Sequence, residues 1–388
     1  MDAIQRGIIT LIKSAVLQQG LELPEGFDLE QALPQIRRHS IIALCYDGAV
    51  RCGIDQKLPV MQKLFMGYVR AMQISEGQLR QIRRICDAFE TNGIDYMLLK
   101  GANMKHLYPA PELRTMGDVD ILIRMEQYDR IEPVMQELGY TFEKEVDCEI
   151  VWDHKELHLE LHKRMLSRDH KDYYLYLGEG WNRAISGRGN SFFMKPEDVY
   201  IFEIIHFAKH FRNGGIGLRH VTDLWLYRDK YPDLDEGYLL EELRKLNMEE
   251  FYGNIRRLIG VWFLDQPEDE MTEFLSAYIF ASGNWGLAEE HFLSSLLRKE
   301  QTEPGQTSQA GFIVSKLFPS AEHLAPKYTV LQKAPWLLPA VWVYRPFYKL
   351  FRERDSLKRE VAKVELVTEE KLDAKRQMLR SVGLEFNF

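Results

Sequence analysis

The chain has 388 residues and a net charge of −8, with 45% hydrophobic and 28% charged residues. This composition is typical of a globular protein with two or three domains, and the acidic balance argues against a long nucleic acid as the main partner. Its four cysteines form no C-x-x-C pair, which gives no indication of a zinc ribbon or a disulfide scaffold. We therefore expect reduced thiols and a cytoplasmic protein. The start lacks a basic region with a cleavage site, and no apolar run predicts a transmembrane helix.

Residues 1–92 are expected to form an N-terminal helical domain. Apolar residues recur at helical spacing over residues 4–15. A second helix is predicted over Gln35–Val50 and a third over Val60–Thr91, where Ser75 takes an apolar position and favours a kink. This part holds no catalytic constellation, so packing or partner binding is its expected role.

Residues 93–194 are expected to form a core with a small mixed sheet. The apolar run Tyr96–Leu99 is short enough to be a buried strand, and the turn Lys100-Gly101-Ala102 follows it. The other elements predicted here are a helix over Glu126–Leu138 and a hairpin of Tyr140–Glu145 with Glu149–Trp152.

Two aspartates stand at the mouth of the next strand, where Gly117-Asp118-Val119-Asp120 runs directly into an apolar stretch. Because side chains alternate along a strand, Asp118 and Asp120 point the same way, with Cα atoms roughly 6.6 Å apart. This spacing suits carboxylates that converge on metal ions about 3.5–4 Å apart. An isolated Asp-x-Asp is more often a solvated strand end, but here a Lys-Gly turn and Arg114 precede it.

The stretch Leu157–His162 shows the most regular alternation in the chain. Its leucines face one way, and His158, Glu160 and His162 face the other. The simplest interpretation is a strand with one solvated face. The functional interpretation makes Glu160 the third carboxylate of a metal site, with both histidines lining the same cleft. A His-Glu-His site is a further alternative, although the nearby aspartates favour Mg²⁺, which prefers oxygen ligands.

Residues 195–298 are expected to form a second helical domain that closes over the core. Pro196 begins a helix that carries His206 and His210 at i, i+4 spacing. The sequence HFAKH lacks the glutamate of the H-E-x-x-H zinc motif, which favours histidines that face a polar cleft or support packing. The next helix begins at Leu218 and includes Arg219, His220 and Asp223.

Residues 299–388 are expected to form a linker and an aromatic, basic tail. Lys299–Gln309 is polar with Pro and Gly, which is typical of a linker. An aromatic patch over residues 335–346 precedes a predicted basic helix over Phe347–Arg359. Docking of this tail on the helical domain is favoured over contact with a membrane surface, because prolines such as Pro339 would break an interfacial helix.

These motifs together resemble the uncharacterised nucleotidyltransferase family of the DNA-polymerase-β-like superfamily. The resemblance rests on the Lys100-Gly101 turn, the Gly117–Asp120 element and Glu160-Leu161-His162, and it extends over about residues 93–229. It implies an α+β fold, in which a small mixed sheet forms the nucleotidyltransferase core between mainly α-helical N- and C-terminal domains. Typical superfamily members have Gly-Gly or Gly-Ser at the turn, whereas this chain has Lys-Gly-Ala.

The resemblance also implies a reaction, in which a nucleoside monophosphate passes from a nucleoside triphosphate to a hydroxyl group of a small molecule or a protein. Asp118, Asp120 and Glu160 would bind Mg²⁺ or Mn²⁺, or Glu160 would take the acceptor's proton. The phosphates would meet the backbone around Gly101 and the charge of Lys100. The other expected ligand-binding residues are Ala102, Arg114, Gly117, His158, His162, His206, His210, Arg219 and Asp223.

Two other functions stay open from the sequence. A non-catalytic nucleotide-binding or partner-binding protein is favoured by the altered turn. The three carboxylates argue against it, because such a cluster repels itself without a metal ion. A metal-dependent phosphohydrolase would use the same carboxylates with water as acceptor, and would release inorganic phosphate instead of pyrophosphate.

Overall fold

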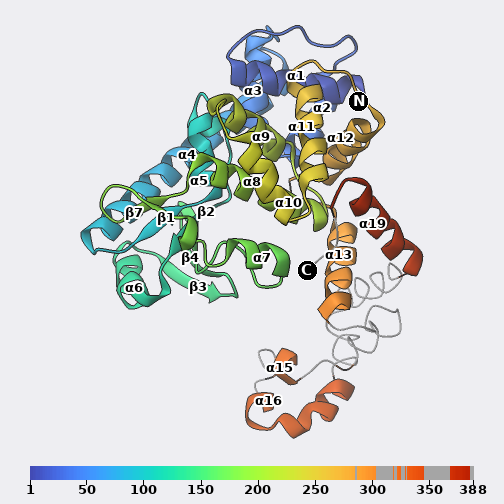
Figure 1. Ribbon diagram of the computed structural model, residues 1–388. Helices are drawn as coiled ribbons and strands as arrows, with labels where there is room; N and C mark the ends of the chain where they lie inside the picture. Colours follow the sequence, from blue (N-terminus) through green and yellow to red (C-terminus); the bar gives the residue numbers. More distant parts are fainter. Residues whose placement is uncertain are drawn as a thin grey trace. The chain divides into compact units, whose positions relative to one another are not determined.

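The computed structural model describes residues 1–284, 286–302, 318, 321–324, 328, 330–344 and 368–384. The fold is mixed α/β, with a seven-stranded mixed sheet flanked by helices (Figure 1), which confirms the predicted fold class. The chain divides into two compact units, Met1–Phe211 with Gly215–Trp285 and Arg212–Gly214 with Gly286–Phe388. No described helix is long and apolar enough to cross a membrane.

The N-terminal helices differ from the expectation at one point. The single helix predicted over Gln35–Val50 is wrong, because the chain turns at Ser40, whose φ of 56° lies in the left-handed region. The predicted third helix is confirmed as one element without a break, and the hydroxyl of Ser75 accepts a hydrogen bond from Lys105 Nζ at 2.9 Å. The four helices are α1 Ala3–Leu17, α2 Leu29–Arg38, α3 Ile42–Arg51 and α4 Pro59–Thr91.

The sheet has the strand order β3-β4-β5-β2-β1-β7-β6. Strands β2 and β5 run parallel, and their register sets Asp118 beside His158 and Asp120 beside Glu160. The strands are β1 Tyr96–Leu98, β2 Asp118–Ile123, β3 Thr141–Glu145, β4 Glu149–His154, β5 Leu157–His162, β6 Ile185–Ser186 and β7 Ser191–Phe193. The sequence predicted the first five but not the short β6 and β7. The pairing therefore joins the two acidic motifs, which lie 40 residues apart.

One face of the sheet is apolar and the other carries the acidic motifs. Helices α4 and α6 (Tyr128–Glu137) pack on the apolar face, where Phe89 and Ile131 meet Val119, Ile121 and Leu159 in one buried cluster. Because side chains alternate along β2 and β5, burial of these residues turns the intervening polar side chains toward the opposite face. The hydrophobic core thus fixes which face carries the candidate site.

The remaining described elements are mostly helices. The first unit adds α5 Lys100–Met104, α7 Lys171–Leu177, α8 Pro196–Arg212, α9 Leu218–Lys230, α10 Glu236–Lys245, α11 Glu249–Phe263 and α12 Glu270–Ser282, with α8 ending in the second unit. The second unit includes α13 Ala288–Thr302, α15 Ala321–Leu324, α16 Val330–Lys333 and α19 Glu369–Ser381. Short 3₁₀ turns occur at Lys105–Leu107, Pro111–Leu113, Met125–Gln127, Trp181–Arg183 and Pro335–Leu337.

The C-terminal predictions are tested only in part. Residues 299–302 of the predicted linker are helical instead, because they form the end of α13. Residues 303–309 and the predicted helix Phe347–Arg359 lie outside the described residues. Pro339 does not break a helix, because residues 338–344 are helical and the proline stands in their first turn, where its missing N–H costs no hydrogen bond.

His39 ties three helices of the first unit together. Its Nε2 donates to the carbonyl oxygen of Phe280 at 3.2 Å, and its Nδ1 accepts from the backbone N–H of Leu218 at 3.3 Å. The side chain is fully buried, and burial lowers its pKa to about 4. In the unfolded chain the imidazole takes up its proton near pH 6.5, so the unfolded state binds more protons between pH 6.5 and 4. Stability should therefore fall as the pH falls through this range.

Because of His39, we expect the free energy of unfolding to fall by about 2–3 kcal/mol as the pH is lowered from 7 to 4.5. The unfolded chain takes up a proton on the ring in this range, whereas the folded protein keeps the ring neutral. Urea unfolding at a series of pH values measures this loss. The variant His39→Gln keeps a donor for the Phe280 carbonyl but has no charge to gain, so its stability should depend less on pH. An equally steep pH dependence in both proteins would contradict the assignment.

Candidate functional site

The parallel pair β2–β5 brings three candidate metal ligands together. Asp120, Glu160 and His162 each offer a ligand atom, and these atoms all lie within 4.8 Å of one another. Nε2 of His162 is 2.7 Å from Oδ1 of Asp120 and 3.6 Å from Oε2 of Glu160. Asp120 and His162 are buried, whereas Glu160 is partly exposed. The structure thus joins two of the three predicted carboxylates and one of the two strand histidines.

Asp118 and His158 lie beside this group without belonging to it. Asp118 opens β2 and is exposed, and its charge helps to raise the pKa of Lys100. The ring of His158 instead faces the neighbouring strands, with Nδ1 3.4 Å from Asp153 Oδ1 and 3.9 Å from Glu143 Oε2. His158 therefore does not join the carboxylates, and the His-Glu-His alternative loses one of its members.

The ammonium group of Lys100 forms an ion pair with one of these carboxylates. Its Nζ donates to Oδ1 of Asp120 at 2.6 Å, from a residue with a φ of 42° at the start of α5. Burial acts to raise the pKa of Asp120, but the charges of Lys100 and His162 outweigh it and hold that pKa well below its usual range. Asp120 is therefore ionised at neutral pH, and the positive charge beside it offsets the repulsion within the acidic group.

Glu149 is a fourth acidic residue here, and it was not among the predicted site residues. It pairs with His162 across β4–β5, and its Oε2 lies 3.8 Å from His162 Nε2. In the sequence it only begins the second strand of a predicted hairpin. Its role depends on the register of that strand against Leu157–His162, which no local pattern shows.

Arg114 and Asp223 were predicted as ligand-binding residues, but they bind each other. Nε and Nη2 of Arg114 donate to the two carboxylate oxygens of Asp223 at 3.0 and 2.8 Å, and Tyr108 donates to Oδ1 at 2.8 Å. Both partners are buried. Nη1 of Arg114 also donates to the carbonyl oxygen of Gly101 at 3.3 Å, so the pair holds the turn after β1 in place.

The glycines around the site differ in what they require. A Cβ on Gly101 would lie 2.9 Å from Met116 Sδ and 3.0 Å from Arg114 Nη1, so only glycine fits without displacing its neighbours. Nothing lies within 4 Å of a Cβ on Gly117, which leaves open space next to Asp118. Ala102 packs against the apolar core. Gly101 and Ala102 are thus explained by packing, whereas Gly117 stands beside free volume.

Helix α8 turns a stripe of titratable residues toward the site. Glu203, His206, Lys209 and His210 follow at the i, i+3, i+4 spacing of one helix face. The pKa of Lys209 is lowered to about 8 by burial and by the charge of Lys100, while Asp120 acts in the opposite direction. Lys209 was not predicted, although this stripe could have revealed it once the helix face was known.

The histidines of α8 and α9 form a neutral cluster. The Nε2 atoms of His206 and His210 lie 2.9 Å apart, and the ring of His220 is centred 6.0 Å from each of theirs. Burial lowers the pKa of all three, to about 3 for His220. The charge of Lys100 also helps to lower the pKa of His206 and His210.

Arg219 and Glu203 complete the surroundings. Arg219 Nη1 donates to the carbonyl oxygen of Thr115 at 2.6 Å. Burial lowers the pKa of Arg219, and the charge of Asp118 acts in the opposite direction. Glu203 is 6% exposed, and its Oε1 has no hydrogen-bond partner among the described residues. Burial and then the charge of Asp223 raise the pKa of Glu203 to about 7, so its carboxyl group is partly protonated at neutral pH.

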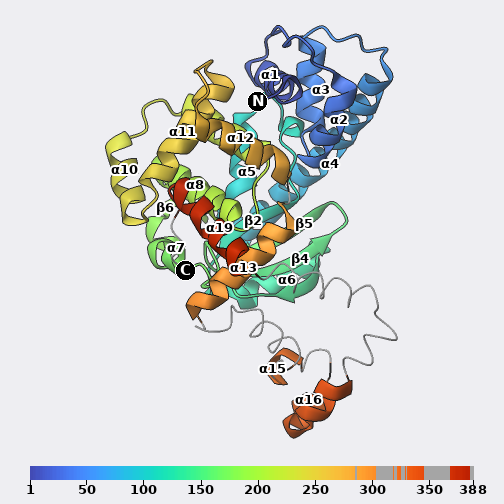
Figure 2. The same cartoon turned by 90° about the vertical axis from the view of Figure 1, so that its right-hand side faces the viewer.

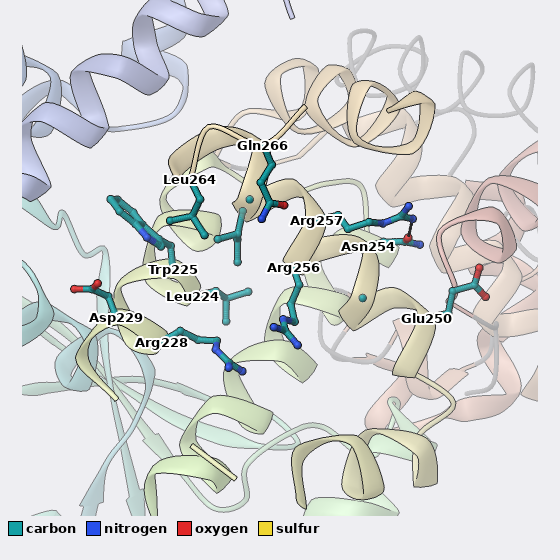
Figure 3. A pocket seen from close by; sticks show the side chains of 13 residues that line it. Leu224, Trp225, Arg228, Asp229, Glu250, Asn254, Arg256, Arg257, Leu264 and Gln266 are labelled. Carbon is teal, nitrogen blue, oxygen red and sulfur yellow. Dashed lines mark hydrogen bonds between the residues drawn. The ribbon is translucent and has the colours of Figure 1, made fainter. Parts of the chain in front are cut away.

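A separate cavity of about 740 Å³ lies between α9 and α11 (Figure 3). Its walls include the apolar Leu224 and Leu264 and three arginines. All three are already paired: Arg228 and Arg256 contact Glu236 at 2.7 and 2.6 Å, and Arg257 contacts Asp269 at 2.9 Å. The cavity contains none of the carboxylates of β2 and β5, so its size alone does not make it the functional site.

Comparison with known proteins identifies a family. No curated protein and no solved structure is significantly similar to the chain. The model of a family described as "Uncharacterised nucleotidyltransferase" matches residues 25–264, which is more than half of the chain and includes the acidic residues of β2 and β5 together with helices α8 and α9. The protein therefore belongs to this nucleotidyltransferase family.

Proposed function

We propose that the protein transfers a nucleoside monophosphate from a nucleoside triphosphate to a hydroxyl group of a small molecule or a protein, with a divalent metal ion bound by Asp118, Asp120 and Glu160. Family membership supports nucleotidyl transfer as the general activity. The observation that carries the proposal is the parallel register of β2 and β5, which sets Asp120 beside Glu160 on the polar face of the sheet. Asp118 stands two residues earlier on the same face.

The donor set fits a divalent ion. Carboxylate oxygens are the ligands that Mg²⁺ and Mn²⁺ take, and the low pKa of Asp120 keeps this ligand ionised. The ammonium of Lys100 already lies 2.6 Å from Asp120 Oδ1, so the position stabilises positive charge. When bound, such an ion would neutralise charge on the phosphates during an in-line displacement.

Cationic side chains from three elements are suited to the triphosphate. Lys100 comes from the turn after β1, Lys209 from α8 and Arg219 from α9. Lys209 is partly buried, and among the described residues no carboxylate lies within 4.0 Å of its Nζ, although an ammonium group removed from water without a partner is costly. A phosphate group would supply the missing anion. Lys100 and Lys209 would then bind phosphate oxygens and orient the chain of phosphates against Asp118 and Asp120.

Nucleotide binding should depend on the metal ion. We expect an α,β-methylene nucleoside triphosphate to bind at least about tenfold more tightly with Mg²⁺ than without it, because the ion borrows phosphate oxygens as ligands. Lys209→Met should weaken this binding by about tenfold, since it removes one charged contact to phosphate. Isothermal titration calorimetry with each of the four nucleotides measures both effects.

Lys155→Ala provides the control for this experiment. Lys155 is an exposed residue in the turn between β4 and β5, close in sequence to Glu160 but outside the cluster. Its removal should leave the affinity unchanged. Binding of equal strength with and without metal, or an equal loss in the control, would count against the proposal.

A further inference from the structure

His162 adds a nitrogen donor to a group that is otherwise made of oxygens. Its Nε2 lies 2.7 Å from Asp120 Oδ1 and 3.6 Å from Glu160 Oε2, so it faces the same space as the two carboxylates. The ring is 2% exposed, so its position is set by packing and not by solvent. His158 on the same strand shares none of these contacts with the cluster.

The backbone fixes which ring nitrogen can serve as a ligand. Nδ1 of His162 lies 3.2 Å from the carbonyl oxygen of Arg164. A carbonyl oxygen can only accept, so Nδ1 must carry the proton in this contact. Nε2 lies 2.7 Å from the ionised carboxylate of Asp120, so it carries a proton as well while no metal ion is bound. A metal ion would replace this proton at Nε2, while the Nδ1–H group keeps its hydrogen bond to Arg164. A hydrogen bond from the other ring nitrogen to a backbone carbonyl is the arrangement that orients metal-bound histidines.

Lys100 shows that the same oxygen of Asp120 is shared between a cation and the imidazole. Its Nζ is 2.6 Å from Asp120 Oδ1, the atom that also contacts His162 Nε2. A cation therefore already shares with the ring the carboxylate oxygen that a metal ion would use. If a metal ion takes this place, Lys100 would be released toward the phosphates. Asp120 and Glu160 would then offer the ion carboxylate oxygens, and His162 would offer a ring nitrogen.

We infer that His162 binds the divalent ion directly through Nε2, and that the site consequently prefers Mn²⁺ to Mg²⁺. Mg²⁺ takes oxygen ligands in strict octahedral geometry and loses its water reluctantly. Imidazole nitrogen suits first-row transition metals, and among these Mn²⁺ is an ion that suits carboxylate oxygens as Mg²⁺ does. The inference rests on the proposed function, because it concerns the ion of the same site.

Pulsed electron paramagnetic resonance tests the nitrogen ligand without any turnover. The full chain is loaded with Mn²⁺ and an α,β-methylene nucleoside triphosphate. The wild-type protein should show the modulation of a ¹⁴N nucleus bound directly to Mn²⁺. His162→Gln should lose it, and His158→Gln should keep it. Absence of the ¹⁴N signal from wild-type protein that has bound Mn²⁺, or its persistence in His162→Gln, would overturn the inference.

Calorimetry with the same nucleotide provides the second measurement. Wild-type protein should bind Mn²⁺ at least about tenfold more tightly than Mg²⁺, and His162→Gln should reduce this preference to within about threefold, because its amide offers an oxygen in place of the nitrogen. Tight binding of both ions with no nitrogen signal would reject this inference alone. Failure of the wild-type protein to bind either ion in the presence of nucleotide would reject both it and the proposed function. The wild-type measurements decide the matter even if His162→Gln does not fold.

Discussion

Asp118→Asn should lower nucleotidyl transfer by at least about a thousandfold, because in the proposed function it removes a charge that would hold the metal ion against the phosphates. Asp118 is exposed at the start of β2 and outside the buried ion pairs, so the substitution should leave the unfolding free energy within about 0.5 kcal/mol of wild type. The loss should therefore appear in activity alone. Steady-state assays of pyrophosphate release, with urea unfolding of the same samples, check both parts.

Asp120→Asn should lower nucleotidyl transfer by a similar factor, but its effect on stability should differ from that of Asp118→Asn. Crowded carboxylates in the sequence suggest that removal of one would relieve repulsion. In the structure Asp120 is instead paired with Lys100 at 2.6 Å and His162 at 2.7 Å, and it is buried. The neutral amide would leave both cations without their anion, which is destabilising. Asp118→Asn is thus the cleaner test of catalysis. Lys155→Ala serves as the control, and full activity in Asp118→Asn would contradict the assignment of this strand.

Asp223→Ala should destabilise the protein by about 3–5 kcal/mol, because it leaves the buried guanidinium of Arg114 without its anion. Arg114 is 4% exposed and donates two hydrogen bonds to Asp223, and Tyr108 would lose its acceptor as well. Activity should also fall, since Arg114 holds the carbonyl oxygen of Gly101 beside the site. Urea unfolding at pH 7 gives the stability.

A surface pair provides the comparison for this second prediction. Glu241 and Lys245 lie 3.6 Å apart on α10, and their side chains are 69% and 51% exposed. Glu241→Ala should cost less than about 1 kcal/mol, because solvent screens such a pair. A double variant, Arg114→Met with Asp223→Leu, should be more stable than Asp223→Ala, since it removes the unpaired charge. Equal losses in Asp223→Ala and Glu241→Ala would show that Arg114 does not depend on Asp223.

The local parts of the fold were predictable because they leave local patterns. The apolar run before Lys100 and the alternation of Leu157–His162 each identify a strand from a few neighbouring residues. The split between α2 and α3 was missed because Ser40 carries no sequence signal for its left-handed φ. The strands β6 and β7 were missed because two or three residues are too few to show a period.

The site was predictable only as far as its residues lie on recognisable strands. Asp120 and Glu160 could be named from alternation, but their pairing depends on the parallel register of β2 and β5, which is a long-range property. For the same reason the sequence could not show that Arg114 and Asp223, 109 positions apart, satisfy each other. Lys209 lies between His206 and His210, and the sequence around it gives no separate signal for a functional lysine. Its importance follows from the absence of a nearby carboxylate among the described residues, which depends on the folded structure.

The fate of the α-phosphate tests the central claim most directly. Protein, Mg²⁺ or Mn²⁺, and a nucleoside triphosphate labelled at the α-phosphorus are incubated with a library of hydroxyl-bearing small molecules and proteins, and both label transfer and released phosphates are followed. The account predicts that label passes to an acceptor with one pyrophosphate released per transfer, and that Asp118→Asn shows neither. Release of inorganic phosphate with no label on any acceptor, or tight nucleotide binding without cleavage, would contradict it.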